Sequence, residues 1–188
     1  MFDADVLGVP LSFETRPGLF SPGGPDEGTL AMLAHVELRA TDKVLDLGCG
    51  YGLVGCWAAT LVGPERVWMV DNDPAAVACA IESVALNDLA GVTVAQSDGF
   101  ADFHESGFTQ ILCHPPYHAD FSVAKGFIEK GFNRLVVGGA MWMVARREDW
   151  YRNRLTAIFG GARVWREDGY FVFRAEKRSS SYANRRPG

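Results

Sequence analysis

The amino-acid sequence predicts an α/β protein with a doubly wound, mostly parallel seven-stranded sheet that ends in a C-terminal antiparallel hairpin. Short apolar runs typical of buried strands alternate with longer stretches typical of helices, an order that favours a parallel sheet covered by helices on both faces. The last two strand-like runs are joined by Asp168-Gly169, a pair that strongly favours a hairpin turn. The closing hairpin therefore adds antiparallel strands to one edge of the sheet.

Apolar runs place the strands, and apolar periodicity places the helices. The expected strands are residues 44–47, 67–70, 92–95, 110–113, 140–145, 162–166 and 170–175. The expected helices are a segment that begins near residues 26–29, followed by residues 56–61, 74–86, 120–132 and 148–159.

Turn-forming residues set the ends of these elements. Asp26 or Thr29 suits the N-cap of the first helix, and Pro74 suits the first turn of the third helix. Gly160-Gly161 ends the last helix. Gly138-Gly139 is expected to end an apolar segment before the fifth strand begins.

Length and composition indicate one domain. With 188 residues, 48% of them hydrophobic and 22% charged, the chain has enough apolar residues for one full core and no room for a second large domain. No apolar run approaches the length of a membrane span, and the first residues are acidic where a signal peptide would be basic. We therefore expect a cytoplasmic protein without a membrane partner.

The two ends of the chain differ from its middle. Residues 1–27 are rich in Pro and Gly, so a loop or cap segment is expected there, followed by the domain itself at residues 28–177. The last fifteen residues carry five basic side chains and one acidic one, although the net charge of the whole chain is −5. We expect residues 178–188 to form a solvated, disordered basic tail. The acidic body argues against a generally basic coat for binding nucleic acid.

A glycine-rich turn follows the first strand. Gly50, Gly52 and Gly55 have the G-x-G-x-x-G spacing, and Asp71 follows about twenty residues later at the end of the next strand. Glycine allows positive φ and close approach of a ligand, and the N–H groups of the following helix attract polar or anionic groups. The pattern therefore predicts a cofactor-binding turn, with a purely structural glycine turn as the alternative.

The full phrases VLDLGCGYGLVG and VWMVDNDP resemble the first two motifs of class I methyltransferases that depend on S-adenosylmethionine (SAM). The resemblance implies SAM as cofactor and S-adenosylhomocysteine as product, with Asp71 on the ribose diol. Asp46 matches the acid that precedes the glycines in that family. Its alternative role is to accept hydrogen bonds from backbone groups of the turn.

The fourth strand ends in His114-Pro115-Pro116-Tyr117, a stiff segment because both prolines have restricted φ. It resembles the [DNS]-P-P-[YFW] motif of methyltransferases that act on exocyclic amines of bases or on amide nitrogens. Such an amine needs acceptors that hold its N–H groups, and an aromatic ring such as that of Tyr117 stacks on a flipped base. These four residues are the predicted catalytic segment.

Further segments extend the resemblance from about residue 16 to residue 177. The segments GLFS, DEGT, WMVA and DGYFVFRA, together with the glycine turn and HPPYH, look like the catalytic domain of ribosomal RNA guanine-N2 methyltransferases, a methyltransferase small domain. The resemblance implies methyl transfer from SAM to a guanine amine in RNA, so RNA is the expected partner. Two-domain members carry an additional N-terminal copy that binds RNA, and we expect these 188 residues to be the catalytic domain without it.

The same resemblance implies a set of cofactor-binding residues. The set is Phe20, Asp26, Gly28, Thr29, Asp46, Gly48, Cys49, Gly50, Asp71, Asn72, Asp98, Gly99 and His114. Gly48 and Gly50 would hold the methionine moiety and Asp98 the adenine amine. The segment from Asp26 to Thr29, together with Phe20, would close over the cofactor. Asp98 has an alternative role as the cap of a helix that begins near Gly99.

His114 stands where that family has Asn. Either its imidazole serves as acceptor or base, or the activity has shifted or been lost. A metal site at His114 and His118 is not expected, because the intervening prolines prevent helical geometry and no third ligand is evident. The alternatives are methylation of a small molecule or a protein amide, and a SAM-binding interaction module without catalysis. A nicotinamide-dependent oxidoreductase ranks last, since it leaves HPPYH unexplained.

Overall fold

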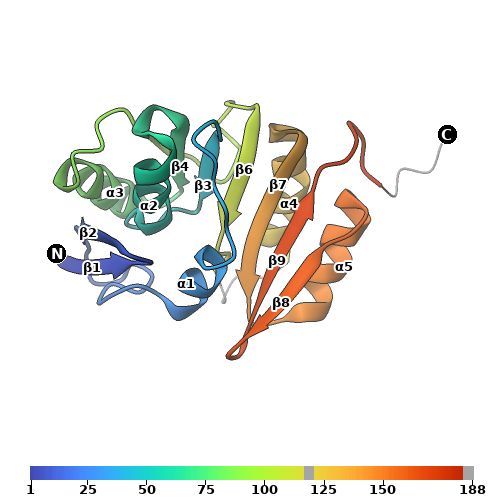
Figure 1. Cartoon of the computed structure of the whole chain (residues 1–188), viewed down its shortest axis with the longest axis horizontal. Coiled ribbons are helices and arrows are strands. Elements are labelled where there is room, and N and C mark those ends of the chain that lie inside the picture. The colour runs from blue at the N-terminus through green and yellow to red at the C-terminus, as the bar shows by residue number, and fades with distance from the viewer. Residues whose placement is uncertain (117–120, 184–188) are drawn as a thin grey trace.

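The computed structural model describes residues 1–116 and 121–183, and its centre is a seven-stranded sheet in the order β5-β4-β3-β6-β7-β9-β8 (Figure 1). The pairs from β5 to β7 are parallel, and β9 is antiparallel to both of its neighbours. The strands of this sheet are β3 (Val44–Leu47), β4 (Val67–Asp71), β5 (Thr93–Gln96), β6 (Phe108–Cys113), β7 (Leu135–Ala145), β8 (Arg163–Glu167) and β9 (Tyr170–Glu176). The predicted fold class is confirmed.

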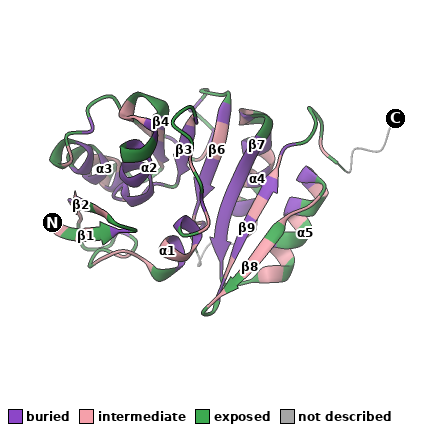
Figure 2. Cartoon of the chain, in the orientation of Figure 1, coloured by how far each residue is buried: buried purple, intermediate pink, exposed green. Residues whose placement is uncertain are grey.

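Helices cover both faces of the sheet. The helices are α1 (Glu27–Leu33), α2 (Leu53–Val62), α3 (Pro74–Leu86), α4 (Phe121–Arg134) and α5 (Glu148–Phe159), with a short 3₁₀ turn at Pro64–Arg66. Buried residues of α1, α2 and α3 form one apolar cluster with one face of the strands, and those of α4 and α5 form a second cluster on the other face. Figure 2 shows that burial is greatest in the central strands, whereas β8 at the edge has only exposed and half-buried residues.

Several predicted boundaries are confirmed, and two are wrong. Helices α3 and α5 have the predicted limits, and Asp26 is the N-cap of α1, where its side chain accepts from the Thr29 N–H. Helix α2 begins three residues earlier than predicted, directly after the glycine turn. Strand β7 includes Gly138 and Gly139, because the ladder with β6 contains a register shift there that keeps both glycines inside the strand.

The prediction of a loop over residues 1–27 is wrong for its first half. Strands β1 (Phe2–Val6) and β2 (Val9–Phe13) form an antiparallel hairpin that closes at Leu7-Gly8, both with positive φ. Val6 and Phe13 are fully buried in the same cluster as α2 and α3, so the hairpin is packed on the domain. Leu at a positive-φ position and Pro10 inside a strand are both unusual, which explains why the sequence did not indicate a hairpin.

The described part of the basic tail packs on the domain instead of being disordered. The Tyr182 hydroxyl donates to the Glu129 carbonyl at 3.0 Å, and the Tyr182 ring contacts the edge of Phe132. The Ala183 N–H donates to the Ile158 carbonyl at 3.0 Å, which joins the tail to the end of α5. The remainder of the predicted tail, residues 184–188, lies outside the described residues. None of the helices described here has the length and apolar character needed to cross a membrane.

Candidate active site

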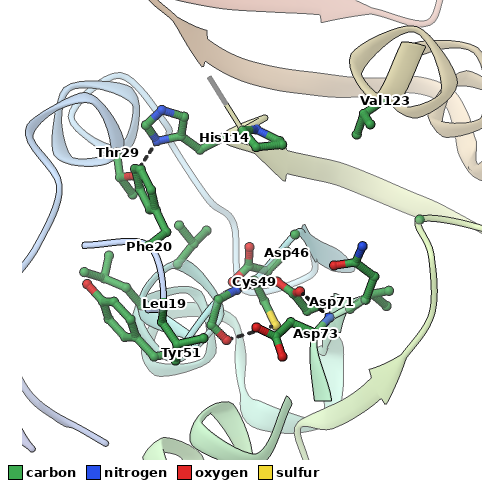
Figure 3. Close-up of a pocket in the computed structure, with 18 of the residues that line it drawn as sticks. Leu19, Phe20, Thr29, Asp46, Cys49, Tyr51, Asp71, Asp73, His114 and Val123 are labelled. Atoms are coloured by element: carbon green, nitrogen blue, oxygen red, sulfur yellow. Dashed lines mark hydrogen bonds between the residues drawn. The ribbon is translucent and has the colours of Figure 1, made fainter. Parts of the chain in front are cut away.

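A cavity of about 480 Å³ opens at the carboxyl ends of β3, β4, β5 and β6 (Figure 3). Most of the predicted cofactor residues line it. The lining residues are Gly18, Leu19, Phe20, Asp26, Thr29, Asp46, Gly48, Cys49, Gly50, Tyr51, Leu53, Val54, Val70, Asp71, Asn72, Asp73, Ser97, Asp98, Gly99, His114, Pro116, Val123 and Phe127. Its position agrees with the general preference of open α/β sheets to bind ligands beyond the carboxyl ends of their strands.

The glycine turn forms the floor of this cavity. Gly48, Gly50 and Gly52 have φ values of +77°, +55° and +92°, which favour glycine over residues with a Cβ. Gly55 has a different reason to be glycine, because a Cβ there would lie 2.3 Å from Met69 of β4. The turn therefore depends on glycine conformation, and the helix after it depends on close packing against β4.

Asp46 is 3% exposed, and its Oδ2 accepts a hydrogen bond from the Gly55 N–H at 2.8 Å. The carboxyl group thus fixes the first turn of α2, as the backbone alternative predicted, and it also lines the cavity. Burial raises the pKa of the Asp46 carboxyl from 3.8 to about 7, and the charge of Asp71 adds to this rise. The Gly55 N–H opposes the shift.

Asp71 ends β4 and is tied to the glycine turn. Its Oδ2 accepts from the Gly50 N–H at 2.8 Å, and its Oδ1 accepts from the Asp73 N–H at 3.0 Å. Asp73 in turn caps α3, where its side chain accepts from the Ala75 N–H. The Asp71 carboxylate is therefore held in one position at the cavity edge, and each of its oxygens keeps a further lone pair that can accept a hydrogen bond.

The far end of the cavity is formed by Asp98 and Gly99 after β5 and by α4. No helix begins at Gly99, since the described chain makes only a turn in which the Ala101 N–H donates to the Asp98 carbonyl, so the helix-cap alternative for Asp98 is wrong. Val123 and Phe127 provide an apolar wall that the sequence analysis missed. Their spacing of four residues on a helix places them on one face, and this was the available signal.

The opposite wall contains His114, Thr29, Asp26 and Phe20. His114 Nδ1 lies 2.8 Å from Thr29 Oγ1 and 3.3 Å from Asp26 Oδ2, and its ring meets the edge of Phe20 with 5.0 Å between centroids. The His114 side chain is 7% exposed. Burial lowers the pKa of His114 to about 4, Arg146 acts in the same direction, and the Asp26 carboxylate opposes both. The imidazole is therefore neutral near pH 7.

Two of the predicted residues that the structure describes, Gly28 and Pro115, do not line the cavity. Gly28 packs under the ring of Tyr170, where an added Cβ would lie 2.4 Å from the ring. Pro115 is buried behind the wall, whereas Pro116 lines it. Tyr117 and His118 lie outside the described residues. Leu19, Tyr51 and Asp73 line the cavity although the sequence analysis did not assign them.

Among the residues that the structure describes, no group of three or more His, Cys, Asp or Glu side chains is gathered in a way that could hold a metal ion. All four cysteines are free and buried. Burial raises the pKa of the Cys49 thiol, and the nearby carboxylates act in the same direction.

Residues 10–174 match the family model described as the methyltransferase small domain. The chain belongs to that family. Within it, the chain is 31% identical over 181 residues to ribosomal RNA small subunit methyltransferase C of Pseudomonas putida (strain W619), an alignment that covers 94% of this chain and 54% of the relative. The corresponding protein of Erwinia tasmaniensis is 32% identical over 187 residues, with the same coverage of both chains.

Solved structures of this family and fold agree with these relationships. The 16S rRNA N2 G1207 methyltransferase (RsmC) of T. thermophilus, solved in complex with AdoMet and guanosine, has a TM-score of 0.82 and 31% identity, with 94% of this chain and 50% of that chain covered. The RNA methyltransferase of Salinibacter ruber in complex with S-adenosyl-L-homocysteine, at 20% identity and a TM-score of 0.63, shares the fold. This methyltransferase small domain spans about half the length of the relatives it matches.

Proposed function

We propose that this methyltransferase small domain binds SAM in the cavity and transfers its methyl group to the exocyclic amine of a guanine in ribosomal RNA, leaving S-adenosylhomocysteine. One observation carries the proposal: the chain is similar along 94% of its length, with a TM-score of 0.82, to an RNA guanine-N2 methyltransferase solved with AdoMet and guanosine. A ribosomal RNA substrate would place this activity in the cytoplasm.

The cavity suits SAM in size and in the kind of group that each wall offers. Its volume of about 480 Å³ lies in the range of small-molecule sites. The Asp71 carboxylate would accept the ribose hydroxyls, and Asp98 would accept from the adenine amine. Val123 and Phe127 would cover the adenine ring with apolar surface. Gly48, Cys49 and Gly50 leave room beside the backbone for the methionine moiety.

On the opposite wall, the neutral side chains of Phe20 and His114 would contact the methyl acceptor. SAM supplies a methyl group already activated by its sulfonium, so the protein has to align donor and acceptor and exclude water. His114 and Pro116 lie at the end of β6, where the amine would have to reach. Phe20 is 46% exposed at the cavity rim, and such a ring can close over a bound ligand. These roles are proposals for the site, as is that of Tyr117.

The proposal can be tested by incubating the purified chain and radiolabelled SAM with ribosomal RNA, ribosomal subunits, total protein or a metabolite mixture. We expect label in ribosomal RNA, recovered as N2-methylguanosine after digestion to nucleosides. Label confined to protein or to small molecules would assign a different substrate. SAM binding without transfer to any fraction would indicate a binding module that has lost catalysis.

A further inference from the structure

A loop at residues 18–24 forms one side of the cavity and contributes Leu19 and Phe20 to its lining. Figure 3 shows Leu19 and Phe20 with Tyr51 on the side of the cavity away from Val123. Leu19 is 9% exposed and belongs to the apolar cluster that also contains Tyr51, whereas Phe20 is 46% exposed. The loop therefore places one side chain in the core and the next one at the cavity rim.

Local hydrogen bonds close this loop on itself. The Gly24 N–H donates to the Ser21 carbonyl at 3.4 Å, and the Ser21 hydroxyl donates to the Gly24 carbonyl at 2.8 Å. Ser21 has a φ of +49°, a conformation that is unfavourable for a residue with a Cβ. Such a conformation persists when contacts with the surrounding structure offset its cost.

Tyr51 supplies a contact of this kind from the glycine turn. Its hydroxyl donates to the Gly24 carbonyl at 3.2 Å, a bond between residues 27 positions apart. The Tyr51 ring is 5% exposed and meets the rings of Phe2 and Phe13 edge-on, each at 5.5 Å between centroids. Burial, together with the nearby Asp26 carboxylate, raises the pKa of the Tyr51 hydroxyl, so this group keeps its proton and stays a donor.

We propose that Tyr51 is a positioning residue that holds the 18–24 loop against the glycine turn, so that both sides of the cavity are in place when SAM binds. Tyr51 lies between Gly50 and Gly52, so its backbone belongs to the cavity floor while its hydroxyl holds the loop. The identity of the ligand rests on the proposed function. A loop that occupies its binding position for only part of the time lowers the apparent affinity by that fraction.

The inference also gives the β1–β2 hairpin a part in ligand binding. No residue of this hairpin lines the cavity. Phe2 and Phe13 nevertheless pack on the Tyr51 ring, and the direction of that ring decides where its hydroxyl lies. The hairpin would therefore affect SAM affinity through Tyr51 without touching the ligand.

Tyr51→Phe tests the inference, because it keeps the ring and removes only the hydroxyl. The Gly24 carbonyl still accepts from the Ser21 hydroxyl in this variant, so it is not left without a donor. Tyr182→Phe is the matched control, since the Tyr182 hydroxyl also donates to a backbone carbonyl, at 3.0 Å, and Tyr182 does not line the cavity.

Three quantities are measured on the wild type and on both variants. Calorimetry gives the Kd for SAM, and methyl transfer to ribosomal RNA gives the KM for SAM and kcat. Mass spectrometry gives the rate of amide hydrogen exchange in a peptide that covers residues 18–24, with and without SAM.

We expect Tyr51→Phe to raise the Kd and the KM for SAM by about 5-fold, the effect of losing about one hydrogen bond, with a smaller change in kcat. Exchange in residues 18–24 should be faster in the free variant and should return to the wild-type rate at saturating SAM. Tyr182→Phe should match the wild type in all three measurements.

Either an unchanged SAM affinity or an unchanged loop exchange in Tyr51→Phe would overturn the inference, as would equal changes in Tyr182→Phe. A fall in kcat as large as the rise in KM would also overturn it, because a positioning role acts on binding. If the wild type binds no SAM, the proposed function fails. Faster loop exchange in Tyr51→Phe would then still support the role of the hydroxyl in holding the loop.

Discussion

Asp46 and Asp71 lie on adjacent strands, and their surroundings give the two carboxylates different tasks. Asp46 is buried and bonded to the first turn of α2, so it is part of the structure of the turn. Asp71 is half-buried and accepts two backbone N–H groups while it remains at the cavity edge. Removing Asp46 should therefore alter folding stability first, whereas removing Asp71 should alter ligand affinity first.

Asp46 should make stability depend on pH. Its pKa of about 7 in the folded state lies above the ordinary 3.8, so between these values the folded protein keeps a proton that the unfolded chain has lost. The free energy of unfolding should therefore fall as pH rises from about 4 to about 7, by up to about 4 kcal/mol from this group. Asp46→Asn cannot titrate, so its stability relative to the wild type should improve over that interval. Urea unfolding at a series of pH values measures this, and parallel curves for the two proteins would contradict it.

Some helix residues do not line the cavity but affect the position of its walls, because they determine how a helix packs against the sheet. Helix α1 is short, and its position depends on Gly28 lying against the Tyr170 ring of β9. This contact sets where Asp26 and Thr29 stand relative to His114, since all three lie at the same end of the sheet. Gly28 does not line the cavity, but its packing thus affects the position of the wall that contains Asp26, Thr29 and His114.

Gly28→Ala should therefore destabilise the protein and weaken the Asp26–His114 contact. The added Cβ would lie 2.4 Å from the Tyr170 ring, and relieving such overlap costs about 1–3 kcal/mol. Gly126→Ala in α4 is the matched control: its Cβ would meet nothing within 4 Å, so the substitution should stabilise the helix by about 0.5–1 kcal/mol. Denaturant unfolding measures both changes. Equal effects of the two substitutions would show that the Tyr170 contact does not constrain α1.

On the scale of the whole molecule, the cavity is lined by residues between Gly18 and Phe127, which come from many separate segments of the chain. The loop at residues 18–20, the turns after β3, β4 and β5, the end of β6 and helix α4 all border it. The hairpin of β1 and β2 supports it from outside, because Phe2 and Phe13 contact the ring of Tyr51, which lines the cavity and donates to the Gly24 carbonyl. A ligand in the cavity would therefore add contacts between segments that are far apart in the sequence.

SAM should consequently raise the melting temperature of the chain. At a concentration 100 times its Kd, a ligand that binds only the folded state adds about 2.7 kcal/mol, which corresponds to about 5–10 °C for a protein of this size. Differential scanning fluorimetry measures the shift. NAD should produce none. Asp71→Asn should lose most of the shift with SAM, whereas Asp88→Asn, an exposed residue beyond α3, should keep it. A shift with NAD equal to that with SAM would contradict the cofactor assignment.

Much of the fold could be predicted because its signals are local. Apolar runs, glycine and proline boundaries and the Asp168-Gly169 turn specify elements through the conformations of a few neighbouring residues, and α3 and α5 have the predicted ends. The same holds for the glycine turn and for the distance to Asp71, which parallel strand pairing then brings together. The hairpin at residues 2–13 was missed because Leu7 and Pro10 gave the opposite local signal.

The sequence by itself determined the order of strands and helices, the glycine turn and the family motifs, because each is encoded by residues close together in the chain. Only the tertiary structure decided that Gly28 faces Tyr170, that Val123 and Phe127 close the cavity, and that Thr29 meets His114 across 85 positions. Such contacts arise from the packing of whole helices and strands against one another. Local patterns do not record which partner each residue meets: the spacing of Val123 and Phe127 indicates a shared helix face, but not the cavity that this face closes.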